Sequence, residues 1–130
     1  MWKIMVVDDD PFNRKLLVEI LDGKANCYLY DSGTKAVEAF KAALDANSSY
    51  DLILLDIAMP DMDGIEALKR FRKLEESHGI RLGQGIPIIM VTAFKAPFMD
   101  SFKGGADDYI LKPFEHDVLI NKIESKIKKK

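Results

Sequence analysis

Short apolar runs alternate with amphipathic stretches from one end of the chain to the other. Three of the runs, Ile4–Val7, Leu52–Leu55 and Ile86–Val91, are bounded by polar or turn residues. Uninterrupted apolar runs of this length predict strands that are buried on both faces, as in a parallel sheet covered by helices. Cys27–Tyr30 and Tyr109–Leu111 are weaker candidates for two further strands.

Four of the intervening segments carry apolar residues at helical spacing, which predicts helices with one face toward the core. These stripes are Phe12, Leu16, Leu17, Ile20 and Leu21; Val37, Phe40 and Leu44; Ile65, Leu68, Phe71 and Leu74; and Leu119, Ile120, Ile123 and Ile127. A fifth, short helix is expected within residues 95–103, which include Pro97. This β–α alternation predicts an α/β fold: a doubly wound, five-stranded parallel sheet flanked by five helices.

Three helix starts carry recognisable capping residues. Asp10 precedes Pro11, so a carboxylate occupies the expected N-cap and proline the first helical position, where its missing N–H is not needed. Asp63 and Glu66 have the spacing of a capping box, and Ser32 is a plausible cap for the second helix.

Composition narrows the class of protein. A chain of 130 residues with 48% hydrophobic and 31% charged residues suits one globular domain. A formal net charge of −2 provides no general attraction for nucleic acid or anionic membranes. The single cysteine cannot form an internal disulfide, and no apolar stretch approaches the length of a membrane span. A cytoplasmic location is therefore expected.

Polar residues follow four of the expected strands. Asp8 and Asp9 follow the first strand, Asp56 follows the third, Thr92 ends the fourth and Lys112 follows the fifth. In open α/β sheets the functional crevice lies beyond the carboxyl ends of the strands, where the strand order reverses. We therefore expect three carboxylates, a hydroxyl and an ammonium group to converge on one edge of the sheet.

Such a carboxylate cluster indicates a cation site. Clustered carboxylates repel one another unless a cation lies among them, and oxygen ligands suit Mg²⁺, with Mn²⁺ as the alternative ion. A phosphoryl group on Asp56 would have its charge met by the ion, by Lys112 and by Thr92. Each residue also has an ordinary structural interpretation: aspartate forms turns, threonine is common in strands and lysine is common on surfaces.

Four motifs give this chain a resemblance to the receiver domains of two-component response regulators, and the resemblance covers nearly all of it. Val6–Pro11 resembles the acidic opening of the family, and Asp56–Gly64 resembles its phosphoacceptor segment, D-x-x-M-P-x-x-D-G. Val91–Ala93 resembles the strand that carries the switch hydroxyl, and Gly105–Phe114 resembles the fifth-strand signature. The resemblance implies the flavodoxin-like form of the expected fold.

The resemblance also implies a role for each site residue. Asp56 is expected to be phosphorylated. The expected ligands of Mg²⁺ are Asp9 and Asp56 directly, Asp8 through water, and the backbone carbonyl of Ala58. Lys112 is expected to contact the phosphoryl oxygens. The remaining expectations are a switch formed by Thr92 and Tyr109, and a cis peptide bond between Lys112 and Pro113.

The function implied is a phospho-switch. A histidine kinase or histidine phosphotransfer protein would donate the phosphoryl group, and the altered surface would bind a downstream protein target, with no direct contact to nucleic acid or membrane. The expected organisation is a single receiver domain over residues 1–130 with no output domain. The protein would catalyse its own phosphorylation and dephosphorylation without being a turnover enzyme.

Two other functions use the same fold. A Mg²⁺-dependent phosphohydrolase with an aspartyl-phosphate intermediate is disfavoured, because Ala58 stands where a second acid is needed and the chain is too short for a cap. A phosphorylation-independent interaction module usually lacks an acidic, threonine or lysine position of the site, and this sequence keeps all of them.

Overall fold

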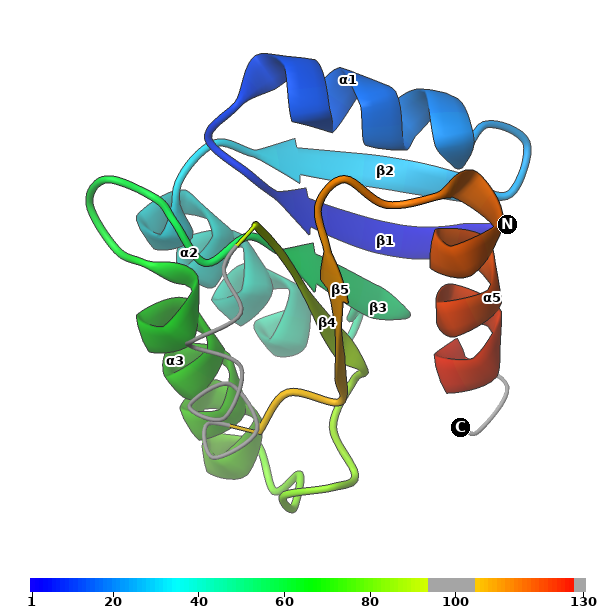
Figure 1. The fold of residues 1–130 in the computed structure, drawn as a ribbon. Helices are drawn as coiled ribbons and strands as arrows, with labels where there is room; N and C mark the ends of the chain where they lie inside the picture. Colours follow the sequence, from blue (N-terminus) through cyan, green and yellow to red (C-terminus); the bar gives the residue numbers. More distant parts are fainter. Residues whose placement is uncertain (94–104, 128–130) are drawn as a thin grey trace.

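The computed structural model describes residues 1–93 and 105–127, which contain five strands and four helices (Figure 1). The elements are β1 Trp2–Val7, α1 Pro11–Ile20, β2 Ala25–Tyr30, α2 Gly33–Asp45, β3 Leu52–Leu55, α3 Gly64–Ser77, β4 Ile88–Thr92, β5 Asp108–Leu111 and α5 His116–Ile127. All pairings are parallel, and the strand order is β2-β1-β3-β4-β5. The predicted doubly wound sheet is confirmed, while the fifth helix expected within residues 95–103 lies outside the described residues.

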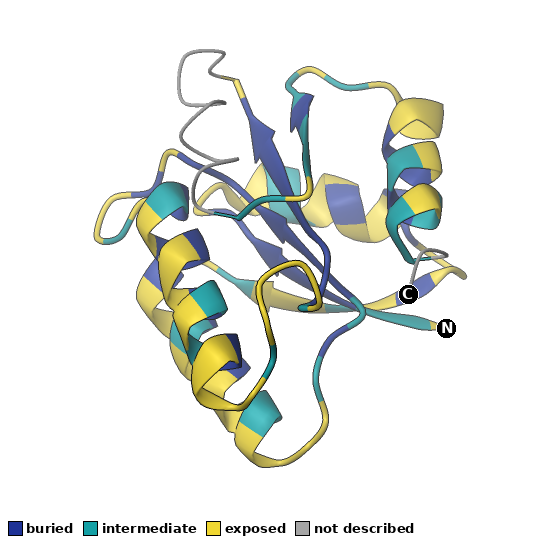
Figure 2. Cartoon of the chain, turned by 90° about the horizontal axis from the view of Figure 1, so that it is seen from below, coloured by how far each residue is buried: buried dark blue, intermediate teal, exposed yellow. Residues whose placement is uncertain are grey.

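The sheet separates two apolar cores, one on each face. Alternate residues of each strand point to opposite faces: Val7 packs on the face covered by α2 and α3, and Val6 packs on the face covered by α1 and α5. In Figure 2 the central strands are buried along their length, whereas the helices expose their outer sides. Burial on both faces explains why these strands have uninterrupted apolar sequences.

The helix caps follow the sequence closely. The side chains of Asp10, Ser32 and Asp63 accept hydrogen bonds from backbone N–H groups in the first turns of α1, α2 and α3. These bonds satisfy donors that a helix start leaves without an intrahelical partner. The three predicted caps are confirmed.

The apolar stripe of α1 is narrower than predicted. Leu17, Ile20 and the C-cap residue Leu21 are buried, but Phe12 and Leu16 are 71% and 37% exposed. Phe12 lies in the first turn, and Leu16 follows it by four residues, which places both on the same flank of the helix. That flank turns away from the sheet, so the prediction that it faces the core was wrong.

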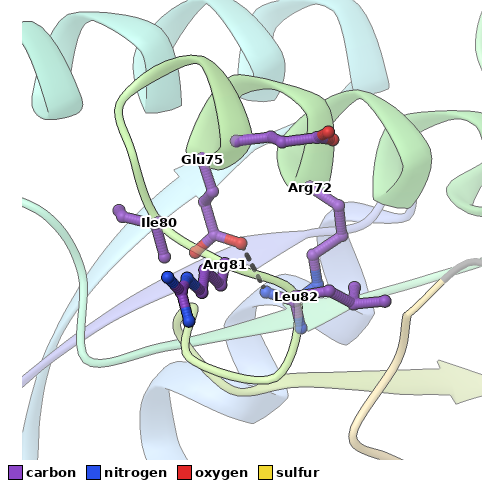
Figure 3. Close-up of a pocket in the computed structure, with 6 residues that line it drawn as sticks. Arg72, Glu75, Ile80, Arg81 and Leu82 are labelled. Atoms are coloured by element: carbon purple, nitrogen blue, oxygen red, sulfur yellow. Dashed lines mark hydrogen bonds and ion pairs between the residues drawn. The ribbon is translucent and has the colours of Figure 1, made fainter.

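A largely buried ionic network joins the end of α3 to the residues just before β4 and β5, and Figure 3 shows its ion pair between Arg72 and Glu75. Glu75 is only 2% exposed, and its carboxylate accepts a hydrogen bond of 2.8 Å from Arg72 and another of 2.8 Å from the backbone N–H of Ile86. Arg72 also donates to Asp107 at 2.8 Å. A β-carbon at Gly85 would collide with the Glu75 carboxylate, so a larger residue there would displace this carboxylate from its partners. The network anchors the long loop after α3, for which the sequence suggested no role.

No helix among the described residues is both long and apolar enough to cross a membrane.

Candidate functional site

The reversal of strand order lies between β1 and β3. From β1 the chain adds β2 on one side and then returns to place β3 on the other. Asp8 and Asp9 directly follow β1, and Asp56 directly follows β3. The backbone N–H of Asp56 donates to the carbonyl of Val7 at 2.9 Å, so the β1–β3 ladder carries the two carboxylate segments to the same edge.

The three carboxylates form a group that could hold a metal ion. One oxygen from each of Asp8, Asp9 and Asp56 lies within 4.8 Å of the others. Asp8 and Asp56 are 1% and 7% exposed, whereas Asp9 is exposed to solvent. Buried carboxylates at this separation need a counter-charge, and an all-oxygen donor set open on one side fits Mg²⁺, which keeps part of its water shell. The residues present therefore fit the expected ion.

Lys112 provides a fixed cation at the same edge. Its ammonium nitrogen lies 2.9 Å from Oδ2 of Asp8 and 3.6 Å from Oδ2 of Asp56. Lys112 is 104 residues from Asp8, and its backbone N–H donates to the carbonyl of Thr92 at 2.8 Å. The ladder between β4 and β5 thus directs the lysine toward the acids, as strand-end reasoning predicted.

The electrostatics of Asp56 differ from those of a surface carboxylate. The pKa of Asp56 is raised from 3.8 to about 6 as the net result of burial, which raises it, Lys112, which lowers it, the charge of Asp8, which raises it, and backbone hydrogen bonds of Ala58 and Ile57, which lower it. Burial is the largest cause, because removal of water penalises the ionised form. The ionised Asp56 carboxylate is therefore disfavoured in the folded protein, and an added cation would reduce this cost.

The backbone around Asp56 is tightly packed. The N–H of Gly64 donates to the carbonyl of Ile57 at 2.8 Å, which closes the loop between β3 and α3. A β-carbon at Gly64 would collide with the backbone carbonyl of Asp56. The loop is also joined to α2, because Thr34 donates to Asp61 at 2.8 Å. These contacts hold the carboxylate segment from two sides.

The remaining predicted residues lie on β4, on β5 and in the loops that follow β3 and β5. Thr92 ends β4 and is 1% exposed, and Ala58 is exposed in the loop after β3. Tyr109 is half-buried on β5 and packs against the core on the α2–α3 face. The peptide bond between Lys112 and Pro113 is cis.

One residue at the site was missed by the sequence reasoning. Arg14, in the second turn of α1, donates from Nη1 to the backbone carbonyl of Asp8 at 2.7 Å. The position of Arg14 relative to the N-cap of α1 was a signal for this contact. Helical side chains lean toward the N-terminus, so an arginine four residues after the N-cap can reach back to the end of the preceding strand.

Comparisons with known proteins agree with this architecture. The family model described as "Response regulator receiver domain" matches residues 4–124. The transcriptional regulatory protein ResD of Bacillus subtilis is 36% identical over 98% of this chain, which spans 48% of ResD. The chemotaxis protein CheY of the same organism is 34% identical, with 93% of each chain covered.

A solved structure shows the same fold. The receiver domain of the sensor histidine kinase PA1611 from Pseudomonas aeruginosa superimposes with a TM-score of 0.81 at 26% identity, covering 98% of each chain. That structure has a magnesium ion coordinated in its active-site cleft.

The matches to the family model, ResD and CheY show that the chain belongs to the response regulator receiver domain family of two-component signalling. It spans about half the length of ResD but nearly the whole length of CheY.

Proposed function

We propose that this protein accepts a phosphoryl group on Asp56 in a Mg²⁺-dependent reaction and thereby changes the surface it offers to a protein partner. One observation carries the proposal: carboxylate oxygens of Asp8, Asp9 and Asp56 lie within 4.8 Å of one another, with the Lys112 ammonium 3.6 Å from Asp56. This arrangement places a nucleophile beside a cation site and a fixed positive charge.

The transfer is an in-line displacement on phosphorus. A carboxylate oxygen of Asp56 attacks, the bond from phosphorus to the donor nitrogen breaks, and the electron pair of that bond stays on the donor imidazole, which takes a proton from solvent. A bound Mg²⁺ would neutralise charge on the phosphoryl oxygens. Asp9, Asp56 and the Ala58 carbonyl would hold the ion, with Asp8 acting through water. Mn²⁺ would serve as a substitute ion.

Two residues of this chain complete the environment of the phosphoryl group. Lys112, 2.9 Å from Asp8 before modification, would turn its ammonium to the new phosphoryl oxygens. Thr92, at the end of β4, would move to donate its hydroxyl to the same group, and half-buried Tyr109 would rotate into the space vacated. These paired movements are the proposed switch, because a local charge change biases a two-state element.

The proposed donor is a phosphohistidine of a histidine kinase or phosphotransfer protein, and the proposed target is a protein. The PA1611 domain, which belongs to a sensor histidine kinase, supports the link to kinases. The net charge of −2 supports a protein target over direct contact with nucleic acid. Residues 1–130 would act as a receiver domain in the cytoplasm, with no turnover of an external substrate.

The test is phosphoryl incorporation measured by intact mass spectrometry with acetyl phosphate as donor. We expect incorporation with Mg²⁺, none with EDTA, and none for Asp56→Asn with Mg²⁺. Asp22→Asn, at an exposed turn after α1, is the matched control and should behave as wild type. Incorporation that persists in Asp56→Asn would overturn the assignment of Asp56. A wild-type protein that takes up no phosphoryl group would overturn the proposed function.

A further inference from the structure

Every polar backbone and side-chain group of Asp8 has a partner within the protein. Its N–H donates to the Tyr30 carbonyl at 3.1 Å, and its Oδ1 accepts from the N–H of Asp10 at 2.9 Å. Its Oδ2 accepts from Lys112 at 2.9 Å, and its carbonyl accepts from Arg14 at 2.7 Å. Asp8 is thus fixed at four points.

The bond from Arg14 has a consequence for the next residue. The carbonyl of Asp8 and the N–H of Asp9 belong to one planar peptide group, so a donor that fixes the carbonyl also fixes that plane. Asp9 is exposed, and its side chain therefore depends on the backbone for its direction. Arg14 is itself partly buried and is held on α1, where its N–H donates to the Asp10 carbonyl at 3.1 Å.

We infer that Arg14 is a positioning residue of the cation site: its hydrogen bond to the Asp8 carbonyl aims the Asp9 carboxylate at the ion. The inference rests on the proposed function, because it assumes that Asp9 is a ligand. Arg14 touches neither the ion nor the phosphoryl group and acts through the peptide between Asp8 and Asp9. Groups that orient metal ligands in this way typically change metal affinity by about 10- to 100-fold when they are removed.

The direction in which Mg²⁺ affinity changes when Arg14 is removed distinguishes a positioning role from an effect of its charge. Arg14 is a cation beside an acidic cluster, so by charge alone it repels Mg²⁺, and its removal would tighten binding. If Arg14 positions a ligand, its removal weakens binding instead. The two roles therefore predict opposite changes in the dissociation constant.

The experiment is isothermal titration calorimetry of the full chain with Mg²⁺ alone, with no phosphodonor present. For Arg14→Met we expect the Kd to rise about tenfold or more, with the variant shown to be folded by circular dichroism. Arg14→Lys keeps the charge and one donor and should give a Kd between wild type and Arg14→Met. Lys15→Met removes the neighbouring, exposed cation and should leave the Kd unchanged or slightly lower.

Each outcome decides the inference. An Arg14→Met Kd equal to or below that of wild type would overturn the positioning role while leaving the proposed function intact. If Arg14→Met does not fold, Arg14→Lys carries the test: a Kd above wild type supports the role, and an equal or lower Kd overturns it. A wild-type protein that binds no Mg²⁺ would overturn the proposed function together with this inference.

Discussion

Neutralising Asp56 should stabilise the protein when no cation is bound. The pKa of Asp56 is raised from 3.8 to about 6, chiefly by burial, so the folded state disfavours the ionised carboxylate that prevails at neutral pH. Asp56→Asn keeps the size of the side chain and removes its charge. We therefore expect the variant to be more stable than wild type at neutral pH in EDTA.

The size of the gain follows from the pKa. A shift from 3.8 to about 6 corresponds to about 3 kcal/mol. Because the site opens to solvent on one side, where Asp9 is exposed, we reduce the expected gain to about 1–2 kcal/mol. A gain of this size is a substantial fraction of the stability of a small domain.

The pH dependence of the gain is its specific signature. When the folded pKa of an acid is raised, the associated stability is present below the unfolded value of 3.8 and is lost as the pH rises through about 6. The advantage of Asp56→Asn should therefore be full at about pH 7.5 and fall to roughly half by about pH 5. Urea unfolding followed by circular dichroism at both pH values measures it.

Added Mg²⁺ should make the wild-type protein more stable than Asp56→Asn. An ion that binds only the folded state at 100 times its Kd adds about 2.7 kcal/mol. Wild type should gain this amount, whereas Asp56→Asn, having lost a ligand, should gain much less. Asp22→Asn, at its exposed turn, should match wild type in every condition. An Asp56→Asn protein no more stable than wild type in EDTA, or an advantage that does not change with pH, would refute this reasoning.

Three further predictions concern stability. Arg72→Met removes the cation beside the buried Glu75 carboxylate and should lower the free energy of unfolding in urea by about 3–5 kcal/mol. Arg70→Met removes only an exposed ion pair with Glu66 and should lower it by less than about 1 kcal/mol. Equal losses for the two variants would contradict the structural role of the Arg72 network. Gly64→Ala should lower the Tm, since its β-carbon meets a neighbouring backbone carbonyl, and an unchanged Tm would show that the loop adapts. A backbone carbonyl of α3 and the Asp45 carboxylate raise the pKa of His78 above 6.5. The contacts of protonated His78 therefore stabilise the folded protein below pH 6.5, and this stabilisation is lost as the pH rises through the folded pKa. The Tm difference between wild type and His78→Gln should shrink from pH 5.5 to 8.5, and a constant difference would contradict it.

Several features of the fold that depend on residues close together in the sequence were predicted correctly. The bounds of β3 were predicted correctly because polar residues flank Leu52–Leu55 on both sides. The caps at Asp10 and Asp63 were predictable because a cap and its partner N–H lie within three residues of each other. The acidic edge was predictable because parallel strands all end at one side of a sheet, whatever their separation along the chain.

Contacts set by tertiary packing were not predictable in the same way. Arg72 and Asp107 are 35 residues apart, and nothing in the local pattern marks them as partners. Glu75 is not part of the predicted apolar stripe of its helix, yet it is buried, with hydrogen bonds from Arg72 and from the N–H of Ile86. The carboxylate of Asp51, just before β3, likewise accepts a 2.7 Å hydrogen bond from the N–H of Lys3, 48 residues away in the sequence.

The proposed site requires a divalent ion among Asp8, Asp9 and Asp56, directly beside the carboxylate that is modified. A crystal structure of the wild-type protein grown with Mn²⁺ would locate the ion by its anomalous scattering. We expect one strong anomalous peak at this edge, within bonding distance of the Asp9 and Asp56 carboxylates and the Ala58 carbonyl. Crystals whose anomalous peak lies away from these residues, or that show none at this edge, would contradict it.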